Sequence, residues 1–313
     1  MASIQSATGP IDTGNLGFTL MHEHIRVSWG AMDNQYPEMF DRKSEIDRAE
    51  ALLKDAHNAG VRTIVDPLPI DLGRDVSLVA EAARRSGVQI IVATGFYYSD
   101  AVFPFRFRED KEMVDLFVRE ITQGISTTGI RAGVIKCATE PYMHAVNEKV
   151  LRCSALAAKE TGVPIVTHTY PQNRTGLDQQ RVFKEAGLDL GHTVIGHSDG
   201  SDDFTYLEQI IQNGSYCGMD RIGGQMPRTS EQRADMVAKL VQKGYADRIT
   251  LSHDRASNMH WMAPVRSVEE LRATGHWTYI PVTFSAMLRE RGVSQEAFNQ
   301  MTVLNPRRLF EGK

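Results

Sequence analysis

The chain has 313 residues, of which 42% are hydrophobic and 24% charged, and its net charge is −4. This composition is ordinary for a folded protein and excludes disordered, collagen-like and coiled-coil classes. The charge balance argues against a nucleic-acid partner, and no apolar run approaches the roughly 20 residues that cross a bilayer. Three cysteines, Cys137, Cys153 and Cys217, lack the spacing of a disulfide framework or a zinc knot. We therefore expect a reduced, cytoplasmic protein with no membrane contact.

Eight short apolar runs rich in valine and isoleucine alternate along the chain with amphipathic segments. The predicted strands are 17–24, 61–66, 88–94, 131–137, 163–168, 193–197, 215–220 and 248–254. The predicted helices are 44–59, 75–85, 110–122, 147–161, 175–186, 202–212, 230–243 and 282–291. Strands that are apolar on both faces and joined by helices form parallel sheets. Eight such units predict one α/β domain over residues 1–313, a (β/α)8 TIM barrel.

A long segment, 255–278, follows the eighth predicted strand. Connections of this length are uncommon in compact domains and are usually functional. This one carries Met259, Trp261, Met262 and Trp277. We expect a lid loop over the active site, whose apolar side chains could hold an acyl chain.

Polar side chains close several of the predicted strands, and this is where catalytic groups lie in such barrels. These residues are His22, His24, Lys136, His168, His197 and Asp254. Each would be costly to bury unless it were coordinated or paired. The spacing of two places His22 and His24 on one face of a strand, with Glu23 on the other. The pattern therefore predicts a metal site at the mouth of the barrel.

Lys136 lies in the apolar run AGVIKCA. Burial would lower its pKa, and a neutral amine can capture carbon dioxide to form a carbamate. The carbamate would supply the negative charge that two divalent ions need, since four neutral imidazoles and one carboxylate supply too little. The alternative is a buried lysine paired with Asp254.

The motifs TLMHEH, GVIKCAT, PIVTHT, GHSDGSDD, CGMDRIG and LSHD occur in this order over nearly the whole chain. The sequence thereby resembles the phosphotriesterase family of the amidohydrolase superfamily, and most of all its phosphotriesterase-like lactonases. The resemblance implies a homodimer that binds two divalent metal ions, with zinc expected first and cobalt, manganese or iron as alternatives.

The resemblance also implies a role for each of the site residues. His22, His24 and Asp254 would hold one ion, His168 and His197 the other, and carbamylated Lys136 would bridge both. Asp254 would take the proton from a bridging hydroxide as it attacks the substrate. Tyr97 would lie near the metals after the third strand. Arg221 would line the substrate pocket after the seventh.

The resulting prediction is a metal-dependent hydrolase that opens lactones, such as acyl-homoserine lactones, with phosphotriester hydrolysis as a side activity. Phosphotriester, carboxylic ester and amide hydrolysis are alternatives within the family. A serine hydrolase is a second possibility, because residues 196–200 fit G-x-S-x-G around Ser198, with Asp254 and either His260 or His276 as partners. A third is a barrel that binds metal without catalysis.

Overall fold

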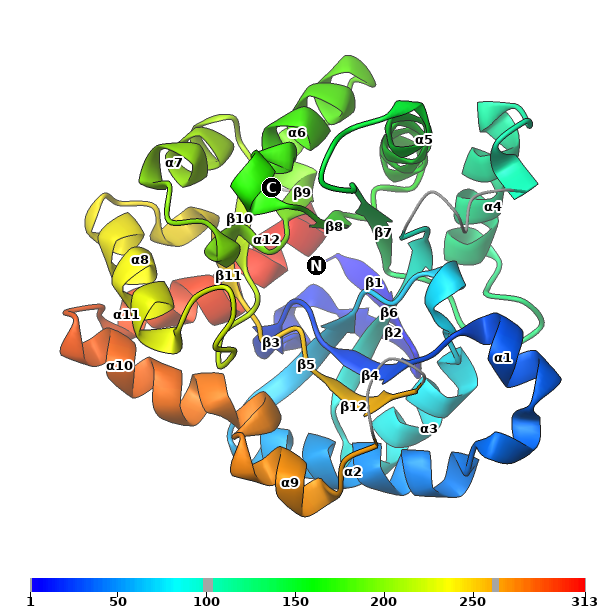
Figure 1. Cartoon of the computed structure of the whole chain (residues 1–313), viewed down its shortest axis with the longest axis horizontal. Helices are drawn as coiled ribbons and strands as arrows, with labels where there is room; N and C mark the ends of the chain where they lie inside the picture. Colours follow the sequence, from blue (N-terminus) through cyan, green and yellow to red (C-terminus); the bar gives the residue numbers. More distant parts are fainter. Residues whose placement is uncertain (1, 98–103, 261–264, 313) are drawn as a thin grey trace.

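The computed structural model describes residues 2–97, 104–260 and 265–312, in which eight parallel strands form a barrel (Figure 1). The barrel strands are β3 (Phe18–Leu20), β5 (Val61–Asp66), β6 (Gln89–Gly95), β7 (Val134–Ala138), β8 (Ile165–His168), β9 (Thr193–Ile195), β10 (Tyr216–Met219) and β11 (Ile249–Leu251). They pair in chain order from β3 to β11. A hydrogen bond from Met21 N to Leu251 O, at 3.5 Å, joins the first strand to the last. The TIM barrel predicted from the sequence is confirmed.

Helices surround the barrel and alternate with its strands. They are α1 (Gly30–Gln35), α2 (Arg42–Asn58), α3 (Val76–Ser86), α4 (Asp110–Thr122), α5 (Ala145–Thr161), α6 (Thr175–Glu185), α7 (Phe204–Gln212), α8 (Ser230–Gln242), α9 (Val268–Ala273), α10 (Ser285–Glu290), α11 (Gln295–Asn299) and α12 (Asn305–Glu311). The eighth predicted helix, 282–291, begins as a π-helical turn over Ile280–Phe284 that continues into α10. None of the helices in the described ranges combines the length and apolar character that a membrane span requires.

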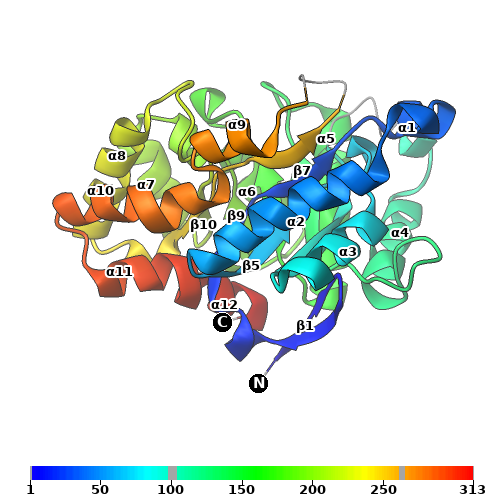
Figure 2. The same cartoon turned by 90° about the horizontal axis from the view of Figure 1, so that it is seen from below.

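The two ends of the barrel carry different elements. The hairpin of β1 (Ser3–Ser6) and β2 (Gly9–Asp12), together with α12 and both termini, lies at one end (Figure 2). At the other end, α1 and α9 flank the mouth toward which the barrel strands run (Figure 2). The hairpin, α11 and α12 were not among the predicted elements.

Alternate residues of the barrel strands face two separate apolar cores. Val65, Ile91, Val134, Val166 and Val194 belong to one buried cluster, inside the barrel. Their neighbours along each strand pack in the second and larger cluster, beneath the helices. Because side chains alternate along a strand, Lys136 shares the inner face with Val134, and His168 shares it with Val166. The period of two therefore directs the lysine and one histidine into the barrel.

The described residues of the segment 255–278, which are 255–260 and 265–278, include a strand and a helix where the sequence predicted a lid loop. Its first part, β12 (Ala256–Met259), pairs in parallel with β4 (His24–Val27), and α9 follows. Trp277 is fully buried and donates through Nε1 to Arg255 O at 3.4 Å, so its predicted place in the substrate wall is wrong. The Trp277 ring is large enough to anchor the segment on the core instead. Trp261 and Met262 lie outside the described residues.

Gly95, the last residue of β6, allows β6 and β7 to approach each other closely at the site. It pairs in register with Lys136, and its φ of 115° lies in a region that favours glycine. A Cβ atom here would collide with the Lys136 carbonyl oxygen. The absence of a side chain at Gly95 thus determines where the Lys136 backbone lies.

We predict that Gly95→Ala lowers the free energy of unfolding by about 3 kcal/mol, the sum of a backbone penalty and an overpacking penalty. Gly162→Ala is the matched control. Its φ is 77°, but a Cβ would meet nothing within 4 Å, so we expect a loss of about 1 kcal/mol. Denaturant unfolding measures both values. Equal losses in the two variants would show that the approach of β6 to β7 is not constrained at Gly95.

Candidate metal centre

His22, His24 and Asp254 bring their side chains together at the mouth of the barrel, as predicted. His24 Nε2 lies 3.2 Å from Asp254 Oδ1, and His22 Nε2 lies 3.7 Å from the same oxygen. Ligand atoms about 2.1 Å from one zinc ion lie roughly 3.0–3.5 Å apart at octahedral to tetrahedral angles. The His24 separation falls in this range and the His22 separation lies slightly beyond it, and the three residues can offer ligand atoms that all lie within 4.8 Å of one another. The donor set of this group fits a divalent metal ion.

The local backbone that positions the two histidines differs from the single strand that was predicted. The strand β3 ends at Leu20, the chain bends, and β4 begins at His24. At the bend, His22 N donates to Ser252 Oγ at 2.8 Å and His24 N donates to Arg255 O at 2.8 Å. These hydrogen bonds to the segment after β11 take the place of the strand-to-strand hydrogen bonds that a continuous strand would form. The two histidines are therefore oriented by that segment and not by the alternation of side chains along one strand.

Asp220, which follows β10, holds two of the histidines and was missed from the sequence. Its Oδ2 lies 2.8 Å from His22 Nδ1, and its Oδ1 lies 2.7 Å from His197 Nδ1. An ionised carboxylate only accepts, so both Nδ1 atoms carry the proton and both Nε2 atoms are left as metal donors. Asp220 could have been found, because it ends the seventh apolar run as the other candidates end theirs.

The remaining candidate ligands lie against this group. The rings of His168 and His197 are 4.4 Å apart between centroids, and those of His22 and His197 are 5.0 Å apart. Lys136 Nζ lies 2.9 Å from His22 Nε2 and 3.5 Å from Thr167 O. In the described ranges, no carboxylate forms an ion pair with Lys136. The pairing of Lys136 with Asp254 that the sequence left open is therefore absent.

Two of the candidate ligands have a left-handed backbone. His197 has a φ of 58° and Asp254 a φ of 55°. This conformation costs a non-glycine residue about 1–2 kcal/mol. Continued extension of β9 would place His197 on the helix-facing side with Ile195. The left-handed turn directs the imidazole inward, where its Nδ1 meets Asp220.

Burial and mutual contact shift the pKa values of the group in opposite directions. Burial lowers the pKa of Lys136 to about 8 and, with Lys136 nearby, that of His22 to about 4. Burial acts against the charged form of His24 too, but hydrogen bonds to Asp254 and Asp66 outweigh it and raise the pKa to about 9. Although burial favours the protonated form of Asp220, His197 and His22 hold its pKa well below the usual range. The carboxylate is therefore ionised at neutral pH.

Tyr97 and Arg221 lie beside the group, although Arg221 is not among the residues that line the pocket next to Asp254. The Tyr97 hydroxyl is 3.0 Å from His168 Nδ1. Arg221 Nε donates to Asp254 Oδ2 at 3.4 Å, on the side away from His24. Asp254 thus has His22 and His24 at Oδ1, and Arg221 is the nearest charged group at Oδ2.

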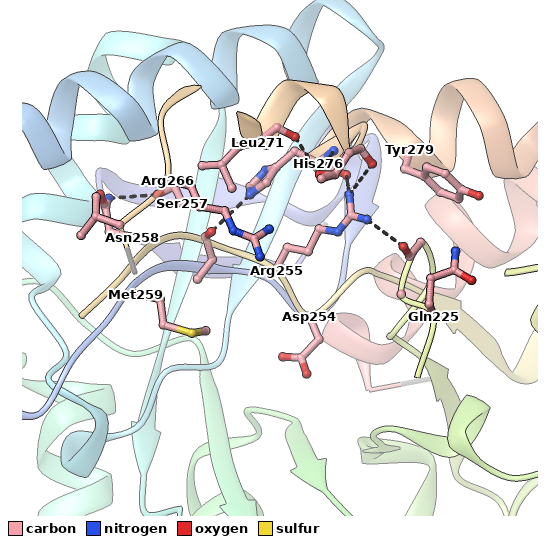
Figure 3. Close-up of a pocket in the computed structure, with 15 residues that line it drawn as sticks. Gln225, Asp254, Arg255, Ser257, Asn258, Met259, Arg266, Leu271, His276 and Tyr279 are labelled. Carbon is pink, nitrogen blue, oxygen red and sulfur yellow. Dashed lines mark hydrogen bonds between the residues drawn. The ribbon is translucent and has the colours of Figure 1, made fainter. Parts of the chain in front are cut away.

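A pocket lies beside Asp254. Its volume is about 730 Å³, and it extends beneath the segment that follows β11 (Figure 3). Ala256, Met259, Val265 and Leu271 give it apolar walls. Asp254 is 22% exposed in its side chain, whereas His22 and His197 are 2% exposed, so the carboxylate faces the space that a substrate would fill.

The serine-hydrolase alternative is wrong. Ser198 is fully buried and its hydroxyl donates to Ile195 O at 2.7 Å. His260 Nε2 lies 2.7 Å from Glu45, and His276 Nε2 lies 3.2 Å from Ala256 O. Neither histidine is positioned to take a proton from Ser198.

Comparisons with known proteins agree with this geometry. The model of the phosphotriesterase family matches residues 2–310. This chain belongs to the phosphotriesterase family. Its relatives include the phosphotriesterase homology protein of Mycobacterium tuberculosis, 41% identical over 99% of this chain and 98% of that one. Another is the aryldialkylphosphatase of Saccharolobus solfataricus, 35% identical over 96% of each.

A solved structure supports the same assignment. The phosphotriesterase from Mycobacterium tuberculosis superposes with a TM-score of 0.92, at 41% identity, over 99% of this chain and 98% of that one. With the family established, this member of the phosphotriesterase family is a hydrolase, and its histidine and aspartate groups could hold metal.

We predict that Asp220→Asn weakens zinc binding by about 10- to 100-fold, the usual effect of removing the partner that orients a ligating imidazole. His22 Nδ1 and His197 Nδ1 contact different oxygens of Asp220, so in the asparagine variant one of them would face an NH2 group, which cannot accept. Asp115→Asn on α4, where the carboxylate meets exposed Lys111, is the matched control. Competition with a zinc-binding dye measures the affinities. Equal affinity in the wild type and Asp220→Asn would contradict the orienting role.

Proposed function

We propose that this phosphotriesterase-family protein hydrolyses lactones at a site that holds two divalent ions. The observation that carries the proposal is the pocket that lies beside Asp254 and has apolar walls. A lactone ring at Asp254 would place its acyl substituent against Met259, Val265 and Leu271. When bound, the ions would activate a water molecule and polarise the oxygen of the substrate. His22, His24 and Asp254 would hold one ion, and His168 and His197 the other.

Three residues of the chain would accept the proton, orient the substrate and supply the bridging negative charge. Asp254 would accept a proton at Oδ2, the oxygen that Arg221 Nε approaches at 3.4 Å. The Tyr97 hydroxyl, beside His168, would orient the carbonyl oxygen of the substrate by donating to it. Lys136 would act as a carbamate, in which the neutral amine bonds to the carbon of CO2 and releases one proton to water. The Lys136 amine is buried and has no carboxylate partner among the described residues, which supports this step.

A phosphotriester is the second candidate substrate. The relative from Saccharolobus solfataricus is named an aryldialkylphosphatase and covers nearly the whole chain at 35% identity. The same groups would stabilise charge that develops on a phosphoryl or a carbonyl oxygen. We expect lactones to be the better substrates, with slower hydrolysis of phosphotriesters.

We predict that a chelator abolishes lactone hydrolysis and that added zinc restores it, because metal would supply the activated water. The measurement is the turnover of a panel of lactones, an aryl ester, an amide and a phosphotriester before and after dialysis against the chelator. A phosphonate that traps serine nucleophiles is the control and should have no effect. Full activity after removal of all metal would refute the proposal, as would a panel in which no lactone is hydrolysed.

We predict that Lys136→Ala loses at least about 100-fold in kcat/KM, as expected when a preorganised charge is removed from a site. A short-chain carboxylic acid supplied with metal should restore part of the activity, because its carboxylate can occupy the space of the carbamate. Acetamide, which has a similar size but no charge, is the control. Full activity in Lys136→Ala would contradict the carbamate.

A further inference from the structure

The pocket beside Asp254 carries an excess of positive charge in its walls. Arg255 and Arg266 both line it, and the remaining lining residues in the described ranges include one carboxylate, Asp254 itself. Asp254 contacts His24 and Arg221, so its negative charge is balanced at the candidate metal centre and does not neutralise the two arginines. The two guanidinium groups are therefore available to the rest of the pocket.

Arg255 is a fixed cation. Its Nη1 donates to Thr274 O at 3.0 Å and His276 O at 2.9 Å, and its Nη2 donates to Gly223 O at 3.0 Å. These three acceptors are neutral carbonyl groups, so they hold the guanidinium in place without neutralising it. Arg255 thereby joins the loop after β10 to the turn after α9, and it forms a rigid charged wall between them.

Arg266 completes the charged part of the pocket. It is exposed, and its guanidinium reaches across the pocket toward Arg255 (Figure 3). In the described part of the chain, no hydrogen bond or ion pair holds the Arg266 side chain. By contrast, Arg272, on the same segment, is paired with Asp55 at 2.7 Å. Two like charges that face the same space attract an anion into it.

Glu23 is a buried carboxylate that contacts the backbone of Arg255 and shares its charge with several other groups. Glu23 accepts from Arg255 N at 3.1 Å, but its Oε1 lies 2.6 Å from His253 Nδ1 and also accepts from Ser252 and His253 N. Burial lowers the pKa of Arg255, the negative charge of Glu23 acts in the opposite direction, and the like charge of Arg266 adds to the lowering. The pocket thus combines apolar walls near Asp254 with a cationic part at Arg255 and Arg266.

We infer that the substrate carries an anionic group, a carboxylate or a sulfonate, on the substituent that extends from its ester bond, and that Arg266 binds this group. This inference rests on the proposed hydrolysis of lactones at Asp254. The ester lies at the metal centre, the connecting methylene groups lie against the apolar walls, and the anion meets the Arg266 guanidinium. Arg255 supplies a second, fixed positive charge. A neutral acyl chain of the same length leaves both charges without a counterion.

The test compares lactones that differ only in the end of their side chain: a carboxylate, a sulfonate, or the methyl ester of the carboxylate, with linkers of two to six methylenes. We expect the wild type to prefer an anionic member about 10- to 100-fold in kcat/KM, the range of one charge-assisted hydrogen bond. The difference should lie mainly in KM. The better anion of the two identifies the group.

Arg266→Gln should lose this preference, and a denaturant unfolding midpoint equal to that of the wild type would show that the variant is folded. Arg272→Gln, which removes an arginine of the same segment outside the pocket, should keep the preference. Arg266→Glu should favour a lactone that ends in an ammonium group. Equal kcat/KM for charged and neutral lactones in the wild type, or an unchanged preference in Arg266→Gln, would overturn the inference.

A binding measurement separates this inference from the proposed function. Adipate and its monomethyl ester differ by one carboxylate, and neither is a lactone. Isothermal titration of the zinc-loaded protein should show that adipate binds about 10-fold more tightly than the ester in the wild type and equally in Arg266→Gln. If no lactone is hydrolysed, the proposed function fails while this titration still decides whether the pocket binds anions. Equal affinity for the two compounds in the wild type would refute the anion site.

Discussion

One buried carboxylate, Asp220, fixes the geometry on which the metal centre depends. It accepts from His22 Nδ1 and His197 Nδ1, at 2.8 and 2.7 Å, and it is 3% exposed in its side chain. In such a setting, an ionised carboxylate that lacked these partners would be strongly unfavourable, and so would two imidazole N–H groups without acceptors. The three groups therefore require one another. Their contact connects the bend after β3 to the ends of β9 and β10 and leaves both Nε2 atoms for metal.

Asp254 and Arg255 link this centre to the pocket. Asp254 faces His24 with one oxygen and Arg221 with the other, and it is the lining residue that the pocket shares with the metal centre. The next residue, Arg255, holds two walls of the pocket together through three carbonyl groups. The proposed proton acceptor and one of the two positive charges of the pocket are therefore consecutive residues after β11, and a shift of this backbone would disturb both.

Much of this structure could be predicted from the sequence. A strand that is buried on both faces has a continuous apolar sequence, and a helix that is buried on one face has an amphipathic sequence. All eight barrel strands follow from this pattern, and Lys136 and His168 follow from the alternation along β7 and β8. The break between β3 and β4 could not be predicted, because the hydrogen bonds that cause it come from residues about 230 positions away. Nor does alternation predict the left-handed turn at His197. Trp277 is an anchor rather than a pocket wall because the segment folds back as β12 and α9.

The central claim is that His22, His24, Lys136, His168, His197 and Asp254 together bind two divalent ions. The most direct test is a crystal structure of the zinc-loaded protein with anomalous data collected above and below the zinc edge, alongside elemental analysis of the same sample. We predict two equivalents of zinc per chain and two anomalous peaks, one between His22, His24 and Asp254 and one between His168 and His197. A single peak, a peak elsewhere, or fewer than two equivalents in the fully loaded protein would contradict the claim.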